Sequence, residues 1–170
     1  METISVKLYR LSYRETKTYG LALLFVAGNL VLPQLFHLLP DGGRMWLPIY
    51  FFTLIAAYKY GWKAGLLTAL LSPTANALLF GMPAPAALPV LLVKSALLAI
   101  AAGWTAARYR KASLLLLAGV VVAYQVVGGL CAWGLQGSFT AAIQDFRMGF
   151  RGLLLQLFGG YFCINFLIRK

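Results

Sequence analysis

Long apolar runs alternate with short polar segments along this chain. Each run approaches the roughly 20 residues that a helix needs to cross the apolar core of a membrane. We therefore predict an all-α integral membrane protein with six transmembrane helices, forming a single membrane domain over residues 1–170, with spans at about 19–39, 46–60, 62–80, 86–107, 113–136 and 149–168. The second run is short, so we expect its flanking aromatic residues to extend it.

The polar segments between the runs predict the connections. Residues 1–18 place Ile4, Leu8 and Leu11 at helical spacing among basic residues, which indicates a helix on the membrane surface or a frayed cytoplasmic tail. Residues 137–148 predict an outer loop. The stretch Ser72-Pro73-Thr74-Ala75-Asn76 puts a helix breaker and three polar side chains at membrane depth, so we expect the third span to be broken near its outer end.

Composition and charge fix the class and the orientation. Apolar residues make up 61% of the chain and charged residues 11%, so lipid must be the solvent for most of the surface. The net charge of +11 falls between the apolar runs, which indicates topology signals and not nucleic-acid binding. Basic residues favour the cytoplasmic side of a membrane, so we predict that both termini lie in the cytoplasm. The basic residues on the outer side are then Arg44, Arg147 and Arg151, and those on the inner side are Lys7, Arg10, Arg14, Lys17, Lys59, Lys63, Arg108, Arg110, Lys111, Arg169 and Lys170.

Lys94 is the most informative single residue. It lies near the middle of the fourth predicted span, where inserting a lysine costs about 2.5 to 3.5 kcal/mol. No acidic residue lies inside any predicted span, so we expect no intramolecular ion pair for Lys94. We interpret it as a cation that receives an anionic group of a ligand. A lysine that reaches an interface or backbone carbonyls, or one held as a neutral amine, remains the alternative.

The other polar side chains gather in the outer half of the predicted bundle. Such a set suits a small polar or anionic solute arriving from outside, and its candidate members are Gln34, His37, Tyr50, Asn76, Gln125, Arg151 and Gln156. For each of them, a satisfied hydrogen bond between helices is the alternative. His37 could ligate a metal or a porphyrin, but a lone histidine near an interface is more often simply solvated. We expect no metal and no cofactor.

The residues of an enzyme are missing from the sequence. There is no paired intramembrane carboxylate, no HExxH or GxSxG motif, no phosphate-binding glycine loop and no acidic ion relay. Cys131 and Cys163 lie in apolar runs without ligand spacing, and we interpret them as small buried hydrophobes. These features predict a receptor that is not an enzyme and takes its energy from another protein.

The whole architecture, together with three short runs, resembles the S components of energy-coupling-factor transporters, which capture vitamins and related micronutrients in prokaryotes. The runs are Leu47-Pro48, then Tyr60-Gly61-Trp62-Lys63-Ala64-Gly65 at the inner turn, and Asn76-Ala77-Leu78-Leu79-Phe80-Gly81-Met82-Pro83 after the third span. The resemblance implies a substrate-binding subunit in a bacterial inner membrane. Its partners would be a transmembrane coupling protein and two cytoplasmic ATPases.

The resemblance also implies sites on this chain. Family members often dock on the coupling protein through small residues four apart on the first helix. Here the small residues are Gly20, Ala22, Ala27 and Gly28, and no two of them are four apart. The family places its substrate at the outer ends of the later helices, where Asn76, Lys94, Gln125, Arg151 and Gln156 fall. Lys94 and Arg151 favour a carboxylate or phosphate, without selecting among pantothenate-like, biotin-like, folate-like or tetrapyrrole ligands.

One further class of function fits the same topology. A six-span scaffold or assembly protein with no transported ligand would show a similar alternation of apolar and polar segments. That class predicts co-purification with envelope proteins and no retained small molecule.

Overall fold

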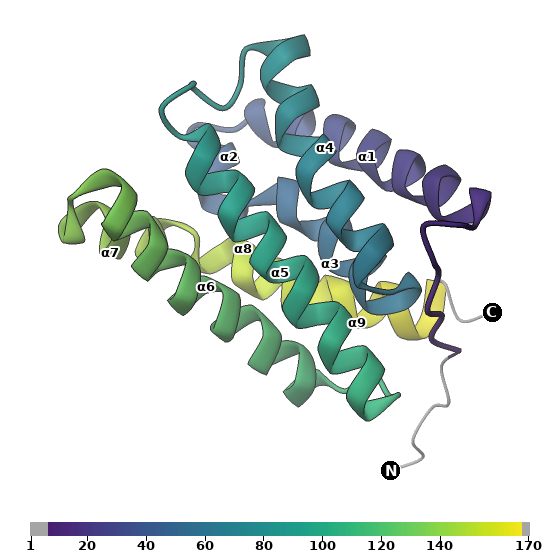
Figure 1. Cartoon of the computed structure of the whole chain (residues 1–170). Coiled ribbons are helices and arrows are strands. Elements are labelled where there is room, and N and C mark those ends of the chain that lie inside the picture. Colours follow the sequence, from purple (N-terminus) through teal and green to yellow (C-terminus); the bar gives the residue numbers. More distant parts are fainter. Residues whose placement is uncertain (1–6, 168–170) are drawn as a thin grey trace.

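The computed structural model describes residues 7–167, apart from the side chains of residues 141 and 142, and this part of the chain forms a bundle of helices (Figure 1). Four helical segments are long and apolar enough to cross a membrane: α1 (Thr16–His37), α5 (Leu88–Tyr109), α6 (Leu114–Gln136) and the C-terminal run Phe150–Leu167. Their outer surfaces expose apolar side chains such as Leu23, Leu115 and Phe158. These segments confirm four of the predicted apolar helices and indicate a membrane protein.

Two shorter helices form the centre of the bundle. α3 (Phe51–Tyr60) and α4 (Trp62–Phe80) pack against each other and between α1 and α5. Leu54, Ala56 and Tyr58 of α3 are completely buried. A Cβ at Gly65 would lie 2.3 Å from the Cβ of Ala57, so glycine is needed for α3 and α4 to approach this closely. α3 has ten residues and covers only about 15 Å, and α4 is not among the four segments long and apolar enough to cross a membrane. A second and a third complete span therefore stay predictions.

The entry to α3 differs from the prediction of one helix over residues 46–60, which is wrong. The chain instead forms a short helix α2 (Gly42–Trp46), a left-handed turn at Leu47 with φ 46°, and a 3-10 turn over Pro48–Tyr50. All four residues from Leu47 to Tyr50 are buried, and irregular backbone at membrane depth is tolerated where protein covers it. The turn carries Tyr50 into the bundle.

The break expected near Ser72–Asn76 is also absent, because α4 runs unbroken through Pro73. Side chains of this stretch bond back to the carbonyls of the preceding turn: Thr74 Oγ1 donates to Leu70 O at 2.8 Å and Asn76 Nδ2 donates to Ser72 O at 3.0 Å. Such bonds satisfy the polar side chains of this stretch within the helix itself, so that they do not interrupt it.

The segment expected to be an outer loop, residues 137–148, is largely a helix, α7 (Phe139–Met148). It folds back beside α6, and the Phe139 ring packs against the Trp133 ring with 5.3 Å between the ring centroids. After α7 the C-terminal run begins as α8 (Phe150–Leu154). It then passes through a π-helical turn, η2 (Leu155–Gly159), the short α9 (Gly160–Phe162) and a second π-helical turn, η3 (Cys163–Leu167).

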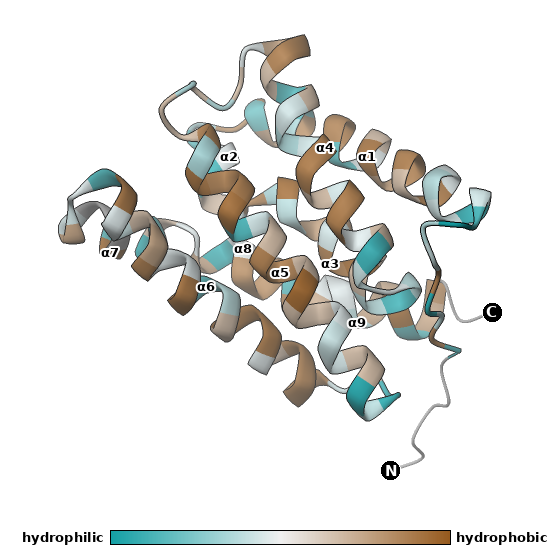
Figure 2. Ribbon diagram, viewed as in Figure 1, coloured by the Kyte–Doolittle hydropathy of each residue, from teal (hydrophilic) through white to brown (hydrophobic). Residues whose placement is uncertain are grey.

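Basic residues collect at the end of the bundle opposite α7. The segment from Lys7 to Glu15 is neither a surface helix nor a frayed tail: it extends along the α3–α4 turn, where Tyr9 N donates to Lys59 O and Leu11 N to Tyr60 O. Figure 2 shows hydrophilic colour on this segment and at the α5–α6 turn, and hydrophobic colour along the helices between the two ends. Residues 1–6, Arg169 and Lys170 lie outside the described residues, and the orientation of the bundle stays a prediction.

Candidate functional site

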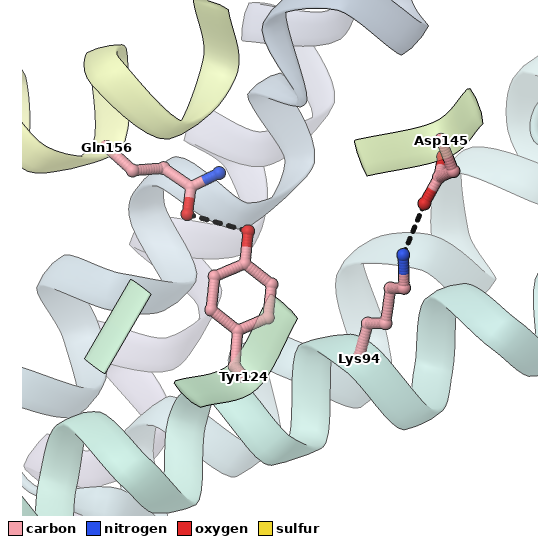
Figure 3. A network of polar contacts seen from close by, with 4 residues as sticks. All are labelled: Lys94, Tyr124, Asp145 and Gln156. Atoms are coloured by element: carbon pink, nitrogen blue, oxygen red, sulfur yellow. Dashed lines mark hydrogen bonds and ion pairs between the residues drawn. The ribbon is translucent and has the colours of Figure 1, made fainter. Parts of the chain in front are cut away.

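A partly buried ion pair between α5 and α7 is the centre of the candidate site (Figure 3). Lys94 pairs with the Asp145 carboxylate, so the expectation of no intramolecular ion pair is wrong. The helix that replaced the expected loop brings Asp145 over α5. The Lys94 side chain is 4% exposed, whereas that of Asp145 is 45% exposed. Lys94 lies six residues after the start of α5, nearer to the α7 end of the bundle than the sequence position suggested.

A second polar pair connects α6 with the C-terminal run. Tyr124 donates its hydroxyl hydrogen to Gln156 Oε1 at 2.9 Å, and both side chains are buried. The Tyr50 ring packs against the Tyr124 ring with 5.6 Å between centroids. The Lys94 side chain packs on Gly128 of α6, one turn after Tyr124. These contacts place the two polar pairs of Figure 3 in one neighbourhood.

Several polar atoms of this neighbourhood have no hydrogen-bond partner among the described residues. Gln125 is 3% exposed, and neither its Nε2 nor its Oε1 has a partner. The same holds for Gln156 Nε2 and for Ser95 Oγ. Because more than nine in ten buried polar groups are hydrogen-bonded, this concentration requires an explanation. We refer to Tyr50, Lys94, Tyr124, Gln125, Asp145 and Gln156 as the Lys94 cluster.

Local features of the helices explain how these side chains meet. A Cβ at Gly128 would lie 2.6 Å from Lys94 Cγ, so the lysine stem crosses α6 over a glycine. Tyr124 and Gln125 lie four and three residues before Gly128, which puts both near the α6 surface that receives Lys94. Gln156 lies in the π-helical turn η2. Such turns widen a helix locally and are frequent at functional sites.

Asn76 lies in a different cluster, which joins α1, α3 and α4. Asn29 Nδ2 donates to Thr53 Oγ1 at 3.1 Å and to Ser72 Oγ at 3.0 Å. Asn29 Oδ1 accepts from Phe52 N, and Asn76 Nδ2 donates to Asn29 O at 2.9 Å. We refer to Asn29, Thr53, Ser72 and Asn76 as the amide network. Its members are buried and bonded between helices, which was the alternative interpretation of Asn76.

Three other predicted site residues lie away from the buried part of the Lys94 cluster. Arg151 is exposed, and its Nη1 lies 4.0 Å from Met45 Sδ. Gln34 is half-buried on α1, and its Nε2 has no partner among the described residues. His37 is exposed at the end of α1 and packs against Gly43. Within residues 7–167, no group of three or more histidine, cysteine, aspartate or glutamate side chains could hold a metal ion.

The small residues of α1 divide between two faces. Ala22 is 1% exposed in the core, and a Cβ at Gly28 would lie 2.8 Å from the Phe52 ring. Gly20 and Ala27 are exposed, and Gly20 has no atom within contact distance of the position its Cβ would take. Of the four small residues, only these two lie on a surface open to a partner.

Sequence reasoning missed Asp145, Tyr124 and Ser95. Asp145 was assigned to a loop, although Phe139, Ile143 and Phe146 follow the helical spacing that could have revealed α7. Tyr124 stands inside an apolar run beside Gln125, and a tyrosine hydroxyl in such a run needs a partner. The sequence offers no comparable signal for Ser95.

Comparison with protein-family models, with curated proteins and with solved structures finds no match to this chain.

Proposed function

We propose that this protein is the substrate-binding subunit of an ATP-driven importer of the energy-coupling-factor type, and that it captures a small anionic micronutrient. The observation that carries this proposal is Gln125, a buried amide with both polar atoms unpartnered on the α6 surface that receives Lys94. A protein whose helices only hold one another together has no use for such a group, because an apolar side chain would cost less.

The cluster offers the donors that an anion requires. Lys94 Nζ carries a positive charge, and Gln125 Nε2 and Gln156 Nε2 are amide donors without a partner among the described residues. Gln125 Oε1 could accept from a hydroxyl or amide group of the same molecule. A carboxylate or phosphate on a small polar body therefore fits this set of groups better than a cation or a purely apolar compound.

In this proposal, the Asp145 carboxylate holds the place beside Lys94 Nζ that the acid group of the ligand would take. Its carboxylate is half exposed and can return to water at little cost, whereas the buried Lys94 cannot. An incoming anion would take over the ammonium group of Lys94 and release Asp145. Because Asp145 lies on α7, this exchange would free one anchor of α7 over the site, and α7 would act as the cover of the binding site.

The partners and the membrane follow from the same proposal. Lys94 and Asp145 form the only ion pair of the described residues, and no acid relay accompanies them, so the energy for import would come from ATPases acting through a coupling protein in the bacterial inner membrane. The exposed Gly20 and Ala27 of α1 are the small residues left open for docking on that protein. Ala22 and Gly28 are engaged inside the bundle.

Native mass spectrometry of the protein purified from its own cells tests the proposal. We expect a retained small acid, such as a compound resembling pantothenate, biotin or folate, that is displaced by an excess of the same compound. Co-purification of a coupling protein and ATPases would support the importer. Absence of any small molecule, together with co-purified envelope-assembly proteins, would favour a scaffold and refute the proposal.

A further inference from the structure

A basic cleft lies at the opposite end of the bundle from the Lys94 cluster. It has a volume of about 690 Å³ and is lined by the extended segment Lys7–Ser12, the turn Gly61–Lys63, three residues near the end of α5 (Gly103, Ala106 and Ala107) and Arg110 directly after that helix. Among the described residues, those with basic side chains that line it are Lys7, Arg10, Lys63 and Arg110. Its volume is in the range of small-molecule sites, which runs from about 300 to 1,000 Å³.

Glycines and backbone hydrogen bonds build this cleft from three separate segments. Gly61 has φ 101°, a conformation that favours glycine, and a Cβ there would lie 3.4 Å from Arg10 Cα. A Cβ at Gly103 would lie 2.4 Å from Trp62 Cβ, so α5 and the turn meet closely. The extended segment is held by Tyr9 N to Lys59 O at 2.8 Å and by Arg10, whose Nη2 donates to Ala107 O.

The positive charge around the cleft is not balanced within the described residues. Three lysines surround the Tyr9 ring, with Nζ of Lys7, Lys17 and Lys59 at 5.2, 5.6 and 5.8 Å from its centroid. Lys59 is completely buried, and its Nζ has no hydrogen-bond partner in the described part of the chain. The one described carboxylate at this end, Glu15, accepts from Ser12 N. Glu2 lies outside the described residues. An anion from outside residues 7–167 would balance this charge.

We propose that the cleft binds the phosphate headgroup of an anionic lipid from the membrane leaflet at this end of the helices. Arginine presents paired N–H donors that match phosphate oxygens, and lysines add charge. Basic clefts between the ends of membrane helices are suited to such headgroups. Arg10 uses one nitrogen on Ala107 O and keeps other N–H donors for a phosphate.

The surface beside the cleft favours a lipid over a soluble phosphate or an acidic peptide. Ile100 and Trp104 are exposed and lie one turn apart on α5, and Trp104 follows the lining residue Gly103. They form an apolar ridge along which an acyl chain can lie. Trp62, in the cleft wall, and Tyr109 are also exposed, and such rings are enriched at the level of lipid headgroups.

Native mass spectrometry of the full-length protein in detergent, titrated with phosphatidylglycerol or phosphatidylcholine, tests this site. We expect preferential binding of phosphatidylglycerol. The double variant Lys63→Gln/Arg110→Gln should weaken that binding about tenfold, because each basic residue contributes to attraction of an anionic headgroup. The control Arg108→Gln/Lys111→Gln removes the same charge from exposed residues outside the cleft lining and should change binding by about twofold at most.

Further arms identify the source of the phosphate. Trp104→Ala leaves the basic residues intact and should weaken phosphatidylglycerol, and millimolar glycerol phosphate should not displace the lipid. Equal loss in the two double variants, or no preference for phosphatidylglycerol, would overturn the proposal. So would displacement by glycerol phosphate, or binding of a hexaglutamate peptide in place of the lipid. Since the cleft and the Lys94 cluster share no residue, failure here leaves the proposed transport function untouched.

Discussion

The amide network and the Lys94 cluster are both polar, both mostly buried and both built between helices, yet they differ in how completely their groups are paired. In the amide network the Asn29 side chain bonds to Thr53, Ser72 and the backbone of Phe52, and its carbonyl accepts from Asn76. In the Lys94 cluster, Gln125 has no partner among the described residues and Gln156 uses only its oxygen.

The difference separates two uses of polar groups in a membrane bundle. A paired network holds helices in register, and its groups have nothing left for another molecule. Unpaired donors and acceptors beside a buried lysine reduce stability, which is tolerated where a ligand completes them. Four variants sharpen this contrast, beginning with the largest expected effect.

Replacing Lys94 by methionine should remove most of the affinity for the retained anion. A hydrogen bond to a charged group contributes about 1.5 to 3 kcal/mol, which corresponds to about a tenfold to hundredfold rise in Kd. Calorimetric titration with the molecule identified by native mass spectrometry measures the change. Lys111→Met, at an exposed residue of the other end, is the matched control. Equal affinity in Lys94→Met and the native protein would exclude this lysine from the site.

Asn29→Ala should affect stability and spare binding. With an average of about 0.6 kcal/mol for each hydrogen bond between membrane helices, loss of the Asn29 side chain should lower the free energy of unfolding by about 2 kcal/mol. Unfolding in sodium dodecyl sulfate, followed by circular dichroism, measures it. The control is Asn165→Ala, since among the described residues the buried Asn165 side chain bonds only to Tyr161 O, in the same C-terminal run. A loss of affinity without a loss of stability would reverse the assigned roles.

Gln125→Leu should show the opposite pattern to Asn29→Ala. Leucine removes two unpartnered polar atoms from a buried position, so the free energy of unfolding should stay constant or rise. Loss of one ligand hydrogen bond, about 1 kcal/mol, should raise Kd about fivefold. Thermal denaturation and titration of the same preparation test both parts. If Gln125→Leu destabilised the bundle as strongly as Asn29→Ala, the distinction between the two clusters would be lost.

Asp145→Asn should produce the smallest change in the Kd for the retained anion, and it should lower that Kd. Removing the carboxylate that competes for Lys94 should tighten binding by up to about fivefold, within the range of partly exposed ion pairs. Asp41→Asn provides a control at the other acid of this end of the bundle. Weaker binding in Asp145→Asn would mean that the carboxylate helps to hold the ligand and is not displaced by it.

The part of the fold that could be predicted from the sequence is the set of helices that follow from the length of the apolar runs. The runs at α1, α5, α6 and Phe150–Leu167 were located within a few residues, because a helix must pair its own backbone where water is absent. The turn at Leu47 and the π-helical turns could not be predicted. The turn at Leu47 depends on close packing against glycine: a Cβ at Gly152 would lie 2.4 Å from Trp46 O.

The sequence predicted how far along each helix the polar side chains of the candidate site lie. It did not predict toward which neighbouring helix each side chain points. Lys94, Gln125 and Gln156 were identified because polar side chains in apolar runs stand out. Asn76 was grouped with them, but its side chain turns toward α1 and joins Asn29. Asp145 was missed because its segment is only moderately apolar, so the partner of Lys94 became visible only once α7 was in place.

Native mass spectrometry of the native protein, Lys94→Met and Asn29→Ala, purified side by side, tests the division between the two clusters most directly. The measured quantity is the fraction of folded protein that carries a small acid. We predict that the native protein and Asn29→Ala retain it and that Lys94→Met does not. Equal retention in all three forms, or its loss only in Asn29→Ala, would contradict the assignment of binding to the Lys94 cluster.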